Sequence, residues 1–137
     1  MEELGVHLVF HKILQRPGLP MWFGVSENNV PVFALPGNPV STLVCLTRYV
    51  IPAVQRSQGS AATPVHVPLA EDVHFAPDLC WFLPVQLQYT EAGTLAVPRP
   101  TNTSGDFVGL RNTDGFIELS REKTQFPAGS SHRFWAW

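Results

Sequence analysis

The distribution of hydrophobic and polar residues differs between the two halves of the chain. In the first part, residues 6–14, 21–25 and 30–35 are rich in Val, Phe, Ile and Leu, and turn-forming residues separate them. We predict one strand for each of these runs. The run at 30–35 is almost wholly apolar, which is typical of a strand buried on both faces of a parallel or mixed sheet.

A helix is predicted directly after this third strand. Asn38 is a favourable N-cap, Pro39 suits the first helical position, and apolar residues then recur at near-helical spacing over 40–58. Pro52 lies inside this pattern. It removes the hydrogen bond to the carbonyl of Arg48 and is therefore expected to kink the helix.

The second part of the chain has the pattern of an all-β unit. It follows the small, flexible stretch at 59–64, so we place a domain boundary between residues 60 and 61. Short strand-like stretches then recur at regular spacing, as in a small sandwich or barrel. They are residues 65–75, 80–89, 94–99, 116–119 and 131–137. A short helix is expected over 104–113.

Composition narrows the class of protein. Of the 137 residues, 45% are hydrophobic and 15% are charged, which is not the composition of a disordered chain. The 13 prolines exclude a helical bundle, because each interior proline costs a helix about 3 kcal/mol. A net charge of −2 excludes a basic platform for nucleic acids.

Targeting signals and cysteine usage favour a cytoplasmic protein without a membrane partner. The apolar runs are too short for a transmembrane helix, and the start of the chain is acidic, unlike a signal peptide. Cys45 and Cys80 make neither a disulfide framework nor a zinc site, so we expect reduced thiols. Glu2 to Gly5 resembles the last turn of a helix, and we expect the C-terminal piece of a longer protein.

The turn at Pro36, Gly37 and Asn38 is the first candidate for chemistry. It lies between a predicted strand end and a predicted helix start, where open α/β sheets bind ligands and where free amides suit a phosphate. Ser41, one turn into the helix, is a candidate ligand hydroxyl. A tight turn with a good cap explains the same residues, and spacing alone favours that explanation.

Other polar residues leave similar alternatives open. Lys12 and Arg16 flank a Pro-Gly turn and suit an anion, although two surface charges are the commoner explanation. The polar run at 101–106 favours a helix cap over a site lined with Arg99. The five histidines have no metal-ligand spacing. Trp81, Trp135 and Trp137 are expected in the core of the all-β part or at a partner interface.

Four segments resemble the molybdopterin molybdenumtransferase (MoeA/gephyrin E-domain) family. They are Phe10 to Gly24, Val32 to Ser41 with its LPGNPVS string, Ser104 to Leu110, and Asp114 to Leu119. The resemblance implies that residues 1–60 are the end of a molybdopterin-binding, three-layer α/β domain. It implies that residues 61–137 are a small all-β barrel domain.

The same resemblance implies an activity in molybdenum cofactor biosynthesis. The family inserts molybdate into adenylylated molybdopterin and releases AMP, with a divalent cation such as Mg²⁺. Its enzymes are homodimers with a site between the α/β domain of one protomer and the barrel of the other. The matching positions near the pterin-phosphate or nucleotide are Lys12, Arg16, Pro36, Gly37, Asn38 and Ser41, with Arg99 and Ser104 facing them from the barrel.

Two departures from the family pattern qualify this expectation. The usual Lys-Pro-Gly-Lys-Pro is Arg16 to Pro20 here, with Leu19 in place of a lysine. The family's acidic, glycine-rich stretch would precede Met1, so the catalytic residues are unknown and we expect this chain alone to be inactive. The alternative is a non-catalytic relative that acts as a binding or scaffold module. A free-standing ligand-binding barrel would require the Pro36 to Ser41 turn to be incidental.

Overall fold

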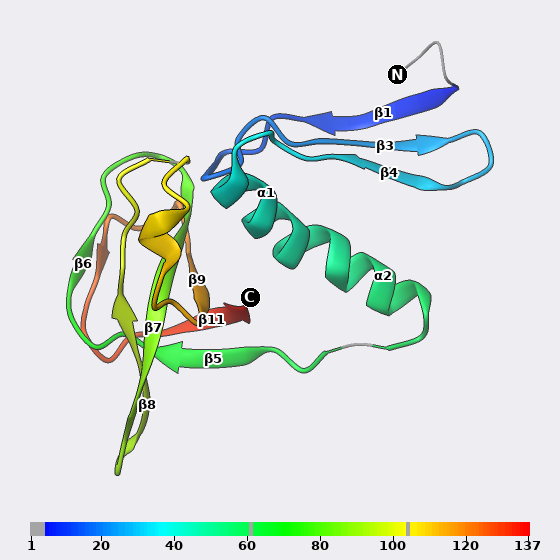
Figure 1. Cartoon of the computed structure of the whole chain (residues 1–137). Helices are drawn as coiled ribbons and strands as arrows, with labels where there is room; N and C mark the ends of the chain where they lie inside the picture. The colour runs from blue at the N-terminus through cyan, green and yellow to red at the C-terminus, as the bar shows by residue number, and fades with distance from the viewer. Residues whose placement is uncertain (1–4, 61, 104) are drawn as a thin grey trace.

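The computed structural model describes residues 5–60, 62–103 and 105–137 (Figure 1). The expected helical turn before Gly5 and the candidate Ser104 lie outside the described residues. Within those residues, no helix has the length and apolar character needed to cross a bilayer.

The first part of the chain forms an antiparallel meander of three strands. These are β1 (Val6–His11), β3 (Trp22–Ser26) and β4 (Pro31–Ala34), hydrogen-bonded in the order β1-β3-β4. The prediction that residues 30–35 form a strand of a parallel or mixed sheet is therefore wrong about the type of sheet. A turn of a few residues joins β3 to β4, and such a turn permits only antiparallel pairing. The strand is also half-buried rather than buried on both faces.

The predicted helix is present and contains a π-helical turn. It runs through α1 (Pro39–Cys45), the π-turn η2 (Leu46–Val50) and α2 (Ile51–Ser57). The Ile51 amide donates to the Leu46 carbonyl, five residues earlier. Pro52 explains this slip, because it has no amide to continue the ordinary ladder. The missing bond is thus accommodated by a wider turn directly before the proline.

The second part of the chain forms most of one curved sheet, which also takes in a short strand from the first part. Its strands are β2 (Gln15–Arg16), β7 (Cys80–Thr90), β9 (Gly115–Leu119), β11 (Ser131–Ala136) and β5 (Val65–Pro68), in that order, with β8 (Gly93–Pro98) also paired to β7. A separate two-stranded piece joins β6 (Val73–His74) to β10 (Gln125–Phe126). The expected helix over 104–113 is reduced to the single 3₁₀ turn η3 (Val108–Leu110).

Apolar side chains on one face of this sheet make its core. The buried cluster is Val67, Leu69, Phe75, Leu83, Val85, Ala96, Ile117, Leu119 and Phe126. Trp81 packs on this cluster and stacks on Phe75, with ring centroids 4.5 Å apart. Trp135 instead belongs to a second cluster against the helix, and Trp137 is partly exposed and donates to the Thr113 hydroxyl at 2.9 Å.

The closed barrel expected for residues 61–137 is not formed by the residues that the structure describes. Strands β5 and β8 lie side by side in the described residues, but no ladder joins them; the bridge at this seam is a single parallel one between Leu69, directly after β5, and Ala96 of β8. Pro68 and Pro98 end these strands and have no amide to extend a ladder. The sheet therefore curls toward closure but stays open along this seam.

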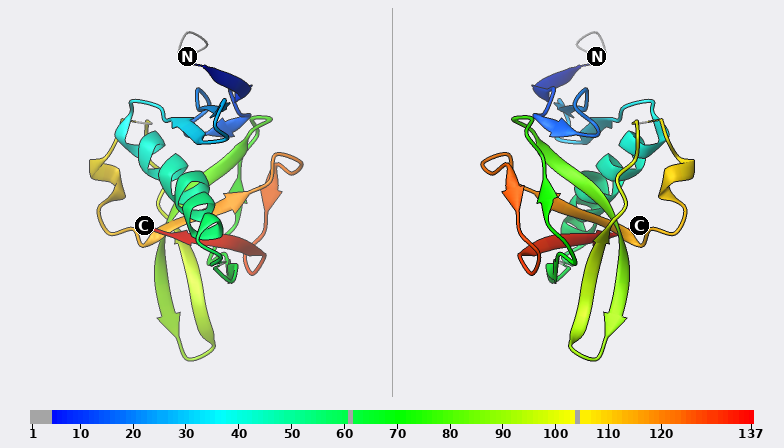
Figure 2. Two further views of the ribbon diagram at one scale, coloured as in Figure 1. Left: turned by 90° about the vertical axis from the view of Figure 1, so that its right-hand side faces the viewer. Right: turned by 90° about the vertical axis from the view of Figure 1, so that its left-hand side faces the viewer.

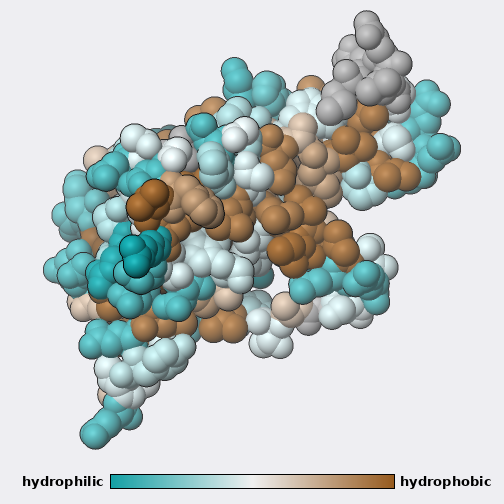
Figure 3. Space-filling model, viewed as in Figure 1, coloured by the Kyte–Doolittle hydropathy of each residue, from teal (hydrophilic) through white to brown (hydrophobic). Residues whose placement is uncertain are grey.

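The helix lies between the meander and the sheet, as Figures 1 and 2 show. Apolar side chains gather over the helix and the meander on the face seen in Figure 3. The helix, strand β1 and the turn before β4 contribute exposed apolar residues, namely Leu8, Val9, Val30, Ile51 and Val54. Strand β2 comes from the first part of the chain but pairs with β7 of the second, so the two parts share a sheet. The boundary between residues 60 and 61 stays a prediction.

Gly115 offers a sharp test of the sheet packing. A Cβ atom there would lie 2.1 Å from the Trp135 carbonyl oxygen, whereas one at Gly37 would meet nothing within 4 Å. We expect Gly115→Ala to lower the free energy of unfolding by about 2–4 kcal/mol, because backbone atoms must move apart. Urea denaturation measures this change, with Gly37→Ala as the matched control. Equal midpoints for the two variants would contradict the packing at Gly115.

The proposed boundary can be tested by limited proteolysis. Residues 56–60 and 62–66 are exposed, and we expect subtilisin to cut first between Gly59 and Pro64. The two products should co-elute in native size-exclusion chromatography, because β2 stays paired with β7 after the cut. A first cut inside the strands of residues 65–137, or products that separate without denaturant, would count against this organisation.

Candidate functional site

The predicted turn after β4 is held to the helix by Thr42. Asn38 has the extended backbone of an N-cap, as expected, with φ −70° and ψ 130°, but its side chain makes no capping bond to the helix amides in the described part of the chain. The Thr42 amide donates to the Asn38 carbonyl at 2.8 Å, and the Thr42 hydroxyl donates to the carbonyls of Pro36 and Asn38. Pro36 is buried, while Gly37 is exposed.

The second predicted turn packs on the same helix. Gly18, which has φ +95°, is so close to α1 that a Cβ atom there would lie 2.6 Å from the Cys45 sulfur. Ser41 is buried and lies four residues before Cys45, so both residues share one face of the helix. The structure therefore brings the Pro17–Gly18 turn and the Ser41 face of α1 together.

Lys12 and Arg16 stand at the two ends of the segment that leads into this turn. Both are exposed. Lys12 has a positive φ of 66°, and its amide donates to the Met21 carbonyl at 3.0 Å. Arg16 lies in β2 and pairs with Trp81 of β7. Their role in binding an anion stays a prediction.

The polar run at 101–106 acts as a cap, as the sequence favoured. Asp106 accepts from the Gly109 amide at 2.9 Å and from the Asn102 amide at 3.3 Å, which fixes the start of η3. Arg99 is exposed and donates to Gln86 and to the Pro98 carbonyl, both within its own sheet. Figures 1 and 2 show η3 on the same side of the molecule as the start of α1.

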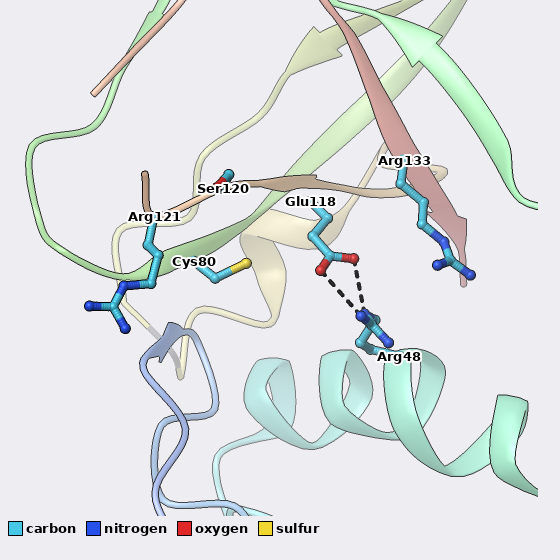
Figure 4. Close-up of a pocket in the computed structure, with 6 residues that line it drawn as sticks. All are labelled: Arg48, Cys80, Glu118, Ser120, Arg121 and Arg133. Atoms are coloured by element: carbon cyan, nitrogen blue, oxygen red, sulfur yellow. Dashed lines mark hydrogen bonds and ion pairs between the residues drawn. The ribbon is translucent and has the colours of Figure 1, made fainter. Parts of the chain in front are cut away.

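A pocket lies where the helix meets the sheet (Figure 4). Its volume is about 330 Å³, and it is lined by Arg48, Cys80, Glu118, Ser120, Arg121 and Arg133. Arg48 of the helix donates twice to the carboxylate of Glu118 on β9, at 2.9 and 3.2 Å. The Trp135 indole donates to the same carboxylate at 3.2 Å. Two guanidinium groups lie against the Trp135 ring, Arg133 at 4.0 Å and Arg48 at 4.7 Å from its centroid.

None of these pocket residues was a candidate from the sequence. A signal was nevertheless present, because Arg48 is the single charge of the π-turn η2 and Glu118 is the single charge of β9. A lone charge on an apolar face needs a partner when it is buried. The sequence does not say that these two residues are each other's partner.

Both cysteines are protonated thiols at neutral pH. Burial raises the pKa of Cys80 to about 11; the nearby Glu118 carboxylate adds to this rise and Arg48 opposes it. Burial also raises the pKa of Cys45 to about 11, against a hydrogen bond from Gln15. Both thiols are therefore weak nucleophiles and poor metal ligands at neutral pH. The described residues contain no group of three His, Cys, Asp or Glu side chains that could hold a metal ion.

Comparisons with known proteins agree on one family. A profile of the MoeA C-terminal region (domain IV) matches residues 66–137. The chain is 39% identical to a molybdopterin molybdenumtransferase of Synechocystis over 98% of its length, which is 33% of that relative. It is 26% identical to the enzyme of the same name from Staphylococcus epidermidis, covering 94% of this chain and 31% of the relative.

Solved structures that are similar to this chain belong to proteins of the same kind. The fold is similar to a molybdopterin biosynthesis MoeA protein from Pyrococcus horikoshii with a TM-score of 0.76 and 32% identity, over 98% of this chain and 33% of that one. A molybdenum cofactor biosynthesis protein from Pyrococcus furiosus has a TM-score of 0.75 at 21% identity, covering 96% of this chain and 46% of that one, and supports the fold alone. The chain spans about a third of the length of the curated relatives it matches.

The electrostatics of the pocket predict a change in cysteine reactivity. Glu118→Gln removes a charge that raises the pKa of Cys80 and leaves Arg48 to stabilise the thiolate. In a Cys45→Ala background, we expect iodoacetamide to alkylate Cys80 about three to ten times faster at pH 8, because the rate follows the thiolate fraction. Mass spectrometry of the labelled peptide measures the rate.

The matched control for this experiment is Asp78→Asn. Asp78 pairs with Arg121, another residue of the same pocket, and is not among the charges that shift the pKa of Cys80. We expect that variant to leave the rate unchanged. Urea midpoints of both variants show whether faster labelling comes from unfolding instead. An unchanged or slower rate in Glu118→Gln would refute the electrostatic account.

Proposed function

Because the chain belongs to the MoeA family, whose C-terminal region its residues 66–137 match, we propose that it is part of a molybdopterin molybdenumtransferase. The proposed reaction inserts molybdate into adenylylated molybdopterin and releases AMP, a step in the biosynthesis of the molybdenum cofactor. Relatives that carry this enzyme name are about three times as long as the chain. The activity is therefore proposed for a protein that contains this chain, and the chain alone is expected to be inactive.

One geometric observation carries the proposal for the site. The Pro17–Gly18 turn packs against the face of α1 that includes Ser41, only three residues beyond the turn at Pro36 to Asn38. The two loops that resemble the family, around Pro17–Gly18 and at Pro36 to Asn38, thus both lie at α1, the first part of the helix. Free amides at the start of a helix favour a negatively charged group, and cations beside them strengthen that preference.

Each candidate residue has a proposed task in this arrangement. Lys12 and Arg16 would neutralise the phosphate groups of the substrate, and their exposure leaves them accessible. Pro36, Gly37 and Asn38 would bring the backbone close to the same groups. Arg99 and Ser104 would complete the site from the second protomer of a homodimer. Ser41 is only 2% exposed, so it would shape the helix start rather than form an open surface.

Mg²⁺ does not fit the residues that the structure describes. The ion binds chiefly through carboxylate oxygens and water, and the described residues contain no group of three His, Cys, Asp or Glu side chains that could hold a metal ion. No step of the proposed reaction is therefore assigned to a metal on these residues. Adenylylated molybdopterin and molybdate are proposed as the substrates, and the molybdenum cofactor and AMP as the products. The proposed location is the cytoplasm, without a nucleic-acid or membrane partner.

A non-catalytic binding role is the second candidate. Leu19 replaces the lysine that the family pattern has in this turn, and its side chain is exposed. The anion site therefore has one positive charge fewer than the pattern provides. A scaffold that kept the fold with a weakened site would have this feature.

The turn at the helix start can be tested by ligand binding. In the full-length protein that contains this chain, we expect Asn38→Ala to weaken the binding of adenylylated molybdopterin or AMP about tenfold. That loss corresponds to about 1.4 kcal/mol, the scale of one hydrogen bond to a charged group. Isothermal titration calorimetry measures the dissociation constant.

Asn28→Ala is the control for this measurement. Asn28 is an exposed turn residue between β3 and β4, away from the helix start. We expect its replacement to leave the affinity unchanged. Equal affinities for wild type and Asn38→Ala would remove the turn from the site, and no binding by the wild-type protein would favour the scaffold.

A further inference from the structure

Gln15 is a buried polar residue that the proposed site does not yet use. It lies in β2, between Lys12 and the Pro17–Gly18 turn, and is only 1% exposed. Burying an amide is unfavourable unless its donors and acceptor are paired. The hydrogen bonds of Gln15 therefore indicate what this residue holds in place.

The Gln15 side chain joins three parts of the molecule. Its oxygen accepts from the Tyr49 hydroxyl of the helix. Its nitrogen donates to the Pro17 carbonyl at 3.2 Å and toward the Cys45 sulfur at 3.5 Å. Its backbone pairs with Cys80 of β7. One side chain thus links the turn to the helix, while its own strand belongs to the sheet.

The loop around Gln15 is closed by its own backbone. The Ile13 amide donates to the Leu19 carbonyl at 2.9 Å, and the Met21 amide donates to the Gly18 carbonyl at 3.2 Å. These bonds give the loop a shape but do not attach it to the helix. That attachment comes from Gln15 and from the close contact between Gly18 and Cys45.

We infer that Gln15 is a positioning residue for the anion site, and this inference rests on the proposed function. It fixes the loop that carries Lys12 and Arg16 against α1. The two cations then keep a fixed position relative to the helix start at Asn38. Gln15 itself is buried and touches no ligand. Its effect on binding passes through the loop, because a preorganised site avoids the entropic cost of ordering on binding.

The main test uses Gln15→Met in the full-length protein. Methionine has a similar shape but cannot replace the two hydrogen bonds that the amide donates. We expect the KM for adenylylated molybdopterin to rise about tenfold while kcat stays within about twofold. If Gln15 only stabilised the fold, the variant would give a different result, because a smaller folded fraction lowers the apparent kcat and leaves KM unchanged.

Two further variants complete the set. Tyr49→Phe removes a single hydroxyl and should raise KM about threefold, which keeps the test informative if Gln15→Met folds poorly. Gln88→Met is the matched control, since Gln88 is an exposed residue of β7. We expect no change in either kinetic constant for that variant. Wild-type KM in both Gln15→Met and Tyr49→Phe would overturn the inference.

Hydrogen exchange on the chain separates this inference from the proposed function. In Gln15→Met, the amides of Ile13 and Met21 should exchange about ten times faster, because the loop loses its side-chain hydrogen bonds to the helix and keeps only the contact between Gly18 and Cys45. The Ile117 amide, in the core strand β9, should be unaffected. A wild-type protein without activity or binding would overturn the proposed function. In that case an unchanged exchange rate at Ile13 and Met21 would also overturn the inference that Gln15 holds the loop.

Discussion

The contact between Arg48 and Glu118 is the constraint on which the rest of the arrangement depends. It ties the only long helix of the described residues to the sheet, and the Trp135 indole completes the carboxylate's set of bonds. Such a partly buried pair adds little net stability, because both charges lose water. Its value is geometric. The same helix begins at the candidate turn and carries Cys45 and Tyr49, so the position of the helix decides where the candidate site lies.

The prolines explain why the helix start and the disturbance near Pro52 were predicted correctly, and why the open seam of the sheet was not. Pro39 at the first helical position and Pro52 inside the helix both act locally, and the helix start and the disturbance near Pro52 followed from them. The π-turn that absorbs the missing amide depends on how the whole helix packs, so only a kink was expected. Pro68 and Pro98 lie at the ends of two outer strands, where their effect on barrel closure appears only once those strands are adjacent.

Contacts between residues that are far apart in the sequence could not be predicted from the sequence. Most strand positions, the helix and the Asp106 cap follow from alternation, turn chemistry and capping, all of which involve neighbours. The pairing of β2 with β7 joins residues about 65 positions apart, and Gln15 looks like an ordinary loop residue until the helix is placed beside it. The parallel or mixed sheet was wrongly expected around residues 30–35 for a related reason, because an apolar run alone does not say which strands lie next to it.

Leu19 shows how the geometry and the charge of the candidate site can change separately. Its backbone carbonyl accepts from the Ile13 amide at 2.9 Å and so helps to close the loop. Any side chain leaves that bond intact, because the carbonyl belongs to the backbone. Replacing a lysine by leucine therefore keeps the shape of the loop and its attachment through Gln15. What is lost is one positive charge beside an anion, and that loss weakens attraction to a phosphate without disordering the site. Weak binding by the wild-type protein would therefore be consistent with an intact loop, whereas loss of the Gln15 contacts would change the loop itself.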